Sequence, residues 1–139
     1  MKKFTDQVWE EYLKENQPDF KGNSEHLRIL LEEGVEGWNK LMDRLPPRTS
    51  DLNGVRLSLH ALKSTAIVPS GATIVDLRRI NLQFSNLKGS VFVNVNFSGS
   101  VMTDVNLQGS TFWYVRFGNV ELGSANLQDT DHNFTDFCG

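Results

Sequence analysis

From residue 50 to residue 139, the chain divides into eighteen consecutive pentapeptides without a change of register. The central residue of each pentapeptide is nearly always large and apolar, as at Leu87 and Phe97. The residue two places before the centre is small or β-branched in seventeen of the eighteen, with His60 as the exception. A period of five fits neither an α-helix, with about 3.6 residues per turn, nor a strand, in which side chains alternate. The pattern therefore predicts a solenoid built from stacked repeats.

The polar positions of the pentapeptide follow the same register. We expect the centre and the residue two before it to face inward, and the other three residues to face outward. Asn or Asp stands immediately before the centre in nine of the eighteen pentapeptides. Glycine stands two places after the centre at Gly54, Gly89, Gly99 and Gly109, where a turn needs a permissive backbone. The residues two before the centre are small because a narrow tube has room for one ring of large side chains.

The first 49 residues lack this period and show helical spacing of their apolar residues instead. Residues 4–16 are predicted to form a short amphipathic helix with Thr5 as its N-cap. A second helix is expected from residue 24 or 25 to residue 45, with a break at Gly34 or Gly37. Stacked repeats need covered ends, so we expect residues 1–49 to cap the first coil of the solenoid.

The repeat region resembles the pentapeptide-repeat family, whose consensus is A-(N/D)-L-x-x. The resemblance covers residues 50–139 and is clear in segments such as Ser85-Asn86-Leu87-Lys88-Gly89 and Ala125-Asn126-Leu127-Gln128-Asp129. It implies a mainly β fold, a right-handed quadrilateral β-helix of about four and a half coils, with residues 1–49 as an α-helical cap. The segments 25–30 and 34–39 are similar to a leader found ahead of the repeats in some bacterial members. The first five pentapeptides are the least regular, so an irregular first coil is expected.

With four pentapeptides in each coil, every twentieth residue should stack, and the outward residues divide among four faces. Three faces are largely polar. The fourth, with its centres at Leu52, Ala72, Phe92, Phe112 and His132, carries a set of outward apolar residues: Ile74, Val91, Val93, Trp113, Tyr114 and Phe134. Aromatic residues gathered on one face are seldom left in water. Either the N-terminal helix covers this face, or it binds a protein partner or a second copy, with Trp113 and Tyr114 as anchors.

The charge of the chain excludes some classes of partner. Residues 1–49 carry eight basic and ten acidic side chains, and residues 50–139 carry six and seven, for a formal net charge of −3. Neither part has the basic surface of a nucleic-acid-binding protein. The first residues lack the apolar region that a signal peptide needs, and no apolar run reaches membrane-spanning length. The single cysteine, Cys138, suits a reducing compartment, so a cytoplasmic protein is expected.

The sequence offers little reactive chemistry. One cluster has the residue types of a metal site: Asp129, Asp131, His132, Asp136 and Cys138. In the repeat geometry these side chains point in different directions, whereas a metal needs ligands that converge. There is no catalytic spacing of Ser, Cys or His, no Walker loop and no Gly-rich dinucleotide turn. We therefore expect neither an enzyme nor a cofactor.

The expected function is that of a non-catalytic protein-binding module. The resemblance implies an alternative, because some family members of the quinolone-resistance type bind DNA gyrase by imitating DNA. That imitation needs a long acidic rod, and this repeat region is short and nearly neutral. A further alternative is an immunity protein that blocks a toxin. The last coil has no cap in the sequence, so a homodimer through His132, Phe134, Phe137 and Cys138 is expected unless the natural chain continues.

Overall fold

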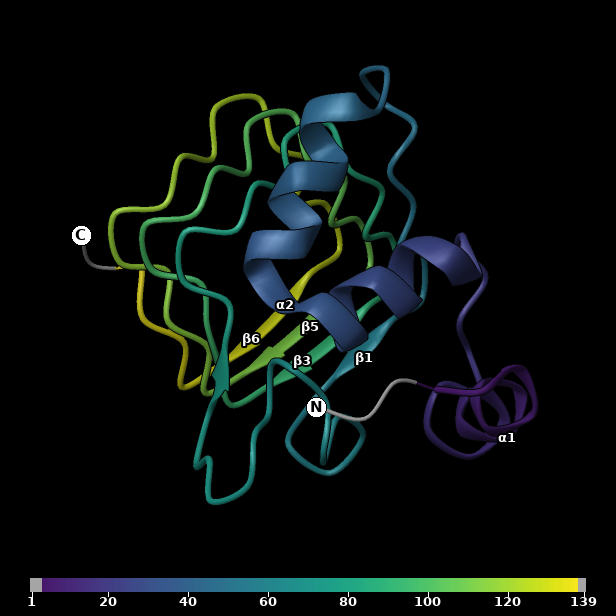
Figure 1. The fold of residues 1–139 in the computed structure, drawn as a ribbon. Coiled ribbons are helices and arrows are strands. Elements are labelled where there is room, and N and C mark those ends of the chain that lie inside the picture. The colour runs from purple at the N-terminus through teal and green to yellow at the C-terminus, as the bar shows by residue number, and fades with distance from the viewer. Residues whose placement is uncertain (1–3, 138–139) are drawn as a thin grey trace.

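The computed structural model describes residues 4–137, which form a stack of short parallel strands with two helices at one end (Figure 1). The strands are β1 (Arg56–Leu57), β2 (Val75–Asp76), β3 (Val91–Val93), β4 (Val95–Asn96), β5 (Thr111–Trp113) and β6 (Asp131–Asn133). One sheet has the order β1-β3-β5-β6, and a second pairs β2 with β4. The predicted β-solenoid with a helical N-terminal region is confirmed. Its right-handed winding and the domain boundary at residue 50 stay predictions.

The stacking distance of twenty residues is confirmed from residue 75 onward. Val75 pairs with Val95, and Val91 pairs with Thr111, which pairs in turn with Asp131. The interior aromatic rings stack in the same register. Neighbouring ring centroids are 5.3 Å apart between Phe92 and Phe112 and 5.5 Å apart between Phe97 and Phe117. These four phenylalanines are buried, so the inward columns form the core of the solenoid.

The first coil departs from the predicted register. Arg56 pairs with Val91 and Asp51 with Asn86, a step of thirty-five residues where twenty was expected. The predicted stacking of Leu57 below Leu77 and of Leu52 below Ala72 is therefore wrong. The three pentapeptides centred on Leu62, Ile67 and Ala72 form no parallel ladder pair with the regular coils, although the Asp76 N–H donates to the Ile67 carbonyl at 3.4 Å.

The columns are correspondingly shorter than the predicted four and a half coils. Three faces have four levels of paired backbone, and the face that begins at Asn81 has three. The three pentapeptides have Ala61, Ala66 and Gly71 before their centres, where half of the repeats have Asn or Asp. Pro69 adds a residue without a backbone N–H, which disfavours pairing with the next coil.

The Asn and Asp residues before the centres set the turns of the regular coils. The Oδ1 atom of Asn86 accepts a hydrogen bond from the backbone N–H of Lys88 at 3.0 Å, and Asn106 and Asn126 repeat this contact in the next two coils. Two places after the centre, the backbone turns into the left-handed region, with φ of 65° at Gly89. A short polar side chain that bonds two residues ahead favours this turn.

The two helices begin where the sequence predicts. The first, α1 (Asp6–Asn16), has Thr5 as its N-cap, and the second, α2 (Ser24–Arg44), has Asn23. The expected break in α2 occurs at Gly34, with φ 74° and ψ −165°. Because the break interrupts the helical hydrogen bonds, the Leu31 carbonyl accepts from the backbone N–H of Ala66 instead, at 2.7 Å. That bond links α2 to residues 60–74, the three pentapeptides that depart from the regular register and are called the departing segment below.

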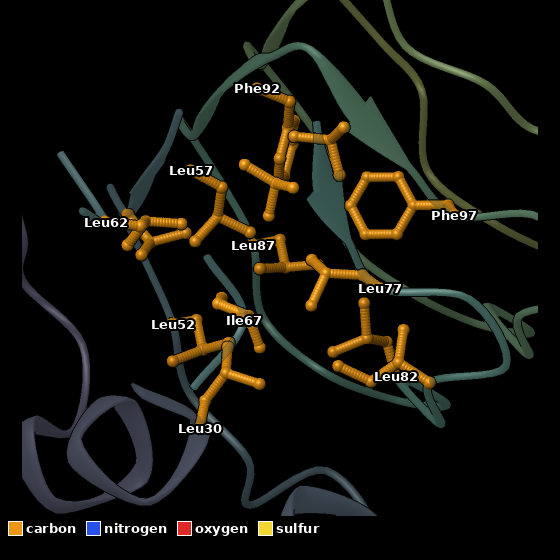
Figure 2. Packing of buried hydrophobic residues seen from close by; sticks show 14 of the residues in the cluster. Leu30, Leu52, Leu57, Leu62, Ile67, Leu77, Leu82, Leu87, Phe92 and Phe97 are labelled. Carbon is orange, nitrogen blue, oxygen red and sulfur yellow. The ribbon is translucent and has the colours of Figure 1, made fainter. Parts of the chain in front are cut away.

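The helices cover the N-terminal end of the solenoid (Figure 1). Leu30 of α2 lies beside Leu52 and Ile67 in the core (Figure 2). Gln17 bonds to both backbone groups of Arg56: its Nε2 donates to the carbonyl at 2.8 Å, and its Oε1 accepts from the N–H at 2.7 Å.

Asn39 makes the same kind of double contact, with the Arg79 carbonyl at 3.1 Å and the Asn81 N–H at 2.8 Å. The side-chain amides of Gln17 and Asn39 thus satisfy the exposed strand edge as a further strand would. This contact explains how the N-terminal region caps the first coil.

Candidate interaction surface

Large apolar side chains that remain exposed are few, and most lie toward the end of the chain. Among residues 4–137 they are Val8, Trp113, Tyr114, Phe134 and Phe137. Trp113, Tyr114 and Phe134 belong to the predicted aromatic face and are called the aromatic patch below. Their exposed fractions are 40%, 51% and 75%.

The strand ladder holds the rings of the aromatic patch in place. Tyr114 and Phe134 occupy the same position in successive coils, and the Tyr114 N–H donates to the Asn133 carbonyl at 3.0 Å. Their ring centroids lie 5.1 Å apart, and the planes differ by 8°. The Trp113 ring is tilted by 43° to that of Tyr114, at 6.5 Å. The patch is therefore a small preorganised stack of rings on a rigid backbone.

The backbone at Tyr114 and Phe134 is unfavourable for aromatic residues. Both lie in the left-handed region, with φ of 55° and 53°. Asn94 occupies the same position one coil earlier, with φ 56°. A short polar residue such as Asn adopts this conformation at a lower cost in free energy. A bulky L-residue in this region costs roughly 1–2 kcal/mol. Since neither ring is buried, folding of this chain does not account for the two aromatic residues.

The other predicted members of this face lie below the patch. Val93 of β3 pairs with Trp113, and Val91 pairs with Thr111, so both valines lie one level lower and are half-buried. Ile74 is also half-buried and directly precedes β2, although the arithmetic that placed it through Ala72 is wrong. The structure thus brings five of the six predicted residues together on β3, on β5 and directly after β5 and β6.

The N-terminal helix does not cover the aromatic patch. It contacts the first of the three departing pentapeptides, where the Tyr12 hydroxyl donates to the Ala61 carbonyl. Burial there raises the pKa of Tyr12 to about 12, although a hydrogen bond from Gln17 opposes the shift. The interpretation in which the helix shields the aromatic face is therefore wrong, and the patch remains open to a partner.

The uppermost described coil continues the interior column. His132 stacks on Phe112 at 5.0 Å and meets the edge of Phe137 at 5.2 Å. Phe137 stacks on Phe117 at 4.8 Å and remains 46% exposed. Cys138, the fourth residue expected at a contact between copies, lies outside the described residues.

The acidic residues near His132 do not assemble into a metal site. Its Nε2 atom forms a hydrogen bond with the Thr130 hydroxyl at 2.7 Å. Within residues 4–137, no group of three His, Cys, Asp or Glu side chains is placed to hold a metal ion. In the same range, neither helix is long and apolar enough to span a membrane.

A comparison with known protein families identifies part of the repeat region. The family model described as pentapeptide repeats, eight copies, matches residues 76–113. Residues 76–113 of this chain are pentapeptide repeats. The resemblance drawn from the sequence is thereby confirmed for these residues, which include β3, β4 and β5 and the second residue of β2.

Two solved structures are similar to this chain. One is the pentapeptide repeat protein Rfr23 from the cyanobacterium Cyanothece 51142, with 18% identity over 63% of this chain and 83% of that one, and a TM-score of 0.29. The other is HetL from the cyanobacterium Nostoc sp. strain PCC 7120, a pentapeptide repeat protein involved in heterocyst differentiation regulation. It has 15% identity over 40% of this chain and 38% of that one, with a TM-score of 0.25. A search of curated protein sequences gives no match.

Proposed function

We propose that this protein is a non-catalytic protein-binding module and that the aromatic patch is its contact surface. The observation that carries the proposal is the stacked pair of Tyr114 and Phe134, which is exposed on a backbone conformation that disfavours it. Large aromatic side chains supply much of the binding energy of protein interfaces. Rings already held in place lose little conformational entropy on binding, so a partner gains affinity from this preorganisation.

The acidic residues of the last repeats favour a partner with a basic surface. Residues 117–137 contain Glu121, Asp129, Asp131 and Asp136 but no Lys or Arg. Every Lys and Arg of the chain lies at or before Arg116. An arginine of the partner would stack on an aromatic face and be attracted by Asp131, which pairs with Thr111 on the face of the patch. Binding should therefore weaken as the salt concentration rises.

A second copy of the chain is the other occupant that we propose for this end. Phe137 and His132 expose their rings on the uppermost described coil, to which Phe134 also belongs. A two-fold contact would bring these rings against their equivalents in the other copy. Imitation of DNA is less well supported, because four levels of strands spaced about 4.8 Å apart make a short rod.

The experiment compares partner binding by the wild-type chain and by the double variant Tyr114→Asn, Phe134→Asn. Asparagine suits the left-handed backbone, as Asn94 does, so the variant should melt at or above the wild-type temperature. Proteins that the immobilised wild-type chain retains from a cell lysate are identified first. The binding of each purified protein to the wild type and to the double variant is then measured. We expect the dissociation constant to rise at least about tenfold in the double variant.

The control is Val8→Ser, which removes an exposed apolar side chain from α1. It should leave the dissociation constant unchanged. A folded double variant that binds every purified partner as tightly as the wild type would refute the proposal. Light scattering on the same samples measures the contribution of a second copy.

A further inference from the structure

A groove of about 620 Å³ lies between α2, the departing segment and one face of the regular coils. Its wall includes Val35 of α2 and Ile67 and Pro69 of the departing segment. The hydrogen bond from Ala66 to Leu31 at the Gly34 break holds these two parts of the wall together. The groove therefore exists because three pentapeptides depart from the regular register, and a regular coil would not form it.

The opposite side of the groove is hollow because its outward residues are small. Above Arg79 in the same column lies Gly99, and beside it on the next level lies Gly118. A Cβ atom on Gly99 would lie 3.4 Å from the Cγ atom of Arg79. The missing side chain leaves room for the Arg79 side chain and for a ligand beside it.

Among residues 4–137, the groove carries one positive charge that forms no ion pair. Asp76 accepts two hydrogen bonds from the Arg78 guanidinium, both at 2.9 Å, so these two charges balance each other. The hydrogen bonds from Arg78 also hold the pKa of Asp76 below its usual range, although partial burial opposes them. Arg79 forms no ion pair with any residue between 4 and 137. The backbone of Arg79 lies in the left-handed region, with φ 64°. Asn119 occupies the same position in the column, and asparagine adopts this conformation at a lower cost in free energy.

We propose that this groove binds a small organic carboxylate, with Arg79 pairing with the carboxylate and Val35, Ile67 and Pro69 contacting an apolar body. The volume lies within the range of about 300–1,000 Å³ that is common for small-ligand sites. A guanidinium offers two parallel N–H donors that match a carboxylate, which explains a preference for this anion. The proposal is independent of the aromatic patch, which lies on another face.

The test is a titration of the ¹⁵N-labelled full chain with sodium hexanoate, followed by the amide signals of Gly99 and Gly118. We expect saturable shifts with a dissociation constant in the range of about 1–10 mM, as one ion pair and a short alkyl chain provide. The neutral analogue 1-hexanol should bind about tenfold more weakly or more. Sodium chloride at the same ionic strength should leave both signals in place.

Arg79→Asn is the informative variant, because asparagine suits the backbone there and the fold should be retained. It should raise the hexanoate dissociation constant at least about tenfold. Arg116→Asn removes the same charge from the same face but does not line the groove, and Asn96 occupies that position one level below. This control should bind as the wild type does.

The absence of saturable shifts at Gly99 and Gly118 would overturn the proposal, as would equal binding by the folded Arg79→Asn variant. Shifts confined to Trp113 and Tyr114 would overturn it too, because hexanoate would then be binding the aromatic patch. The double variant Tyr114→Asn, Phe134→Asn should bind hexanoate normally. A failure of the protein-binding proposal would thus be distinguishable from a failure of this one.

Discussion

Replacement of Gln17 by glutamate tests how the N-terminal region caps the solenoid. The side-chain amide of Gln17 is 3% exposed and bonds to both backbone groups of Arg56, at 2.8 Å and 2.7 Å. An ionised glutamate still accepts the hydrogen bond from the Arg56 N–H. It has no hydrogen to donate to the Arg56 carbonyl, and its negative charge would face that oxygen.

The size of the effect follows from the lost contact and the burial. A buried acceptor left without its partner costs about 1–3 kcal/mol, and desolvation of the carboxylate adds to this. We expect Gln17→Glu to reduce the free energy of unfolding by about 3 kcal/mol at pH 7. For a domain of this size, the melting temperature should fall by about 10 °C.

The destabilisation should depend on pH, because a protonated glutamate donates and accepts as glutamine does. The folded protein then binds the added proton more readily than the unfolded chain, so the pKa of the introduced carboxyl is raised on folding. Between the unfolded and folded pKa values, stability falls as the pH rises, by about 1.4 kcal/mol per pH unit. The difference in the free energy of unfolding between Gln17→Glu and the wild type should therefore be largest at pH 7 and should shrink as the pH approaches 4.5.

The assay is urea unfolding of both proteins, followed by circular dichroism at pH 7 and at several lower values. Gln7→Glu, the same change at an exposed position of α1, should alter the free energy of unfolding by less than about 0.5 kcal/mol at every pH. A difference between Gln17→Glu and wild type that stays constant from pH 7 to pH 4.5 would refute the role assigned to the Gln17 amide.

Three further substitutions test other parts of the fold by the same unfolding measurement. Gly34→Ala should cost about 2 kcal/mol, because φ 74° with ψ −165° suits only glycine; a neutral effect would mean that the break in α2 is not required. The Nδ1 atom of His26 accepts from the Asp51 N–H at 3.1 Å, and burial lowers the pKa of His26, although the Asp51 carboxylate opposes this. Stability should therefore fall as the pH drops below about 6.5, and His26→Gln should show a smaller fall; equal pH profiles would contradict this. Phe112→Ala should cost about 3–5 kcal/mol, since the ring stacks between Phe92 and His132, and a loss below about 1 kcal/mol would show that the column repacks.

Much of the local structure could be predicted because its causes are local. The Asn residues before the centres bond two residues ahead, and Thr5 and Asn23 cap the helices that follow them. The break at Gly34 follows from the conformational freedom of glycine. The candidate patch was also predictable in part, since Trp113, Tyr114 and Phe134 stand at outward positions of regular repeats.

The step of thirty-five residues in the first coil could not be predicted from the period. Leu62 and Ile67 keep the apolar centres of the repeat, and both are buried, but neither has the ladder pair that the period predicts. Pro69 gave a signal, because it has no backbone N–H to donate to a neighbouring coil. That signal does not indicate where the departing segment goes, since its position depends on contacts with α2.

The sequence by itself determined the repeat, the turns, the helix ends and the outward position of the aromatic residues, because each depends on interactions within a few residues. Only the tertiary structure decided which end α2 covers, which strand edges Gln17 and Asn39 complete, and whether the aromatic patch stays exposed. The groove beside Arg79 belongs to the second group, since its walls come from α2 and from a segment about thirty residues further along the chain. Contacts between distant segments depend on how the whole chain packs, and a local pattern does not contain that information.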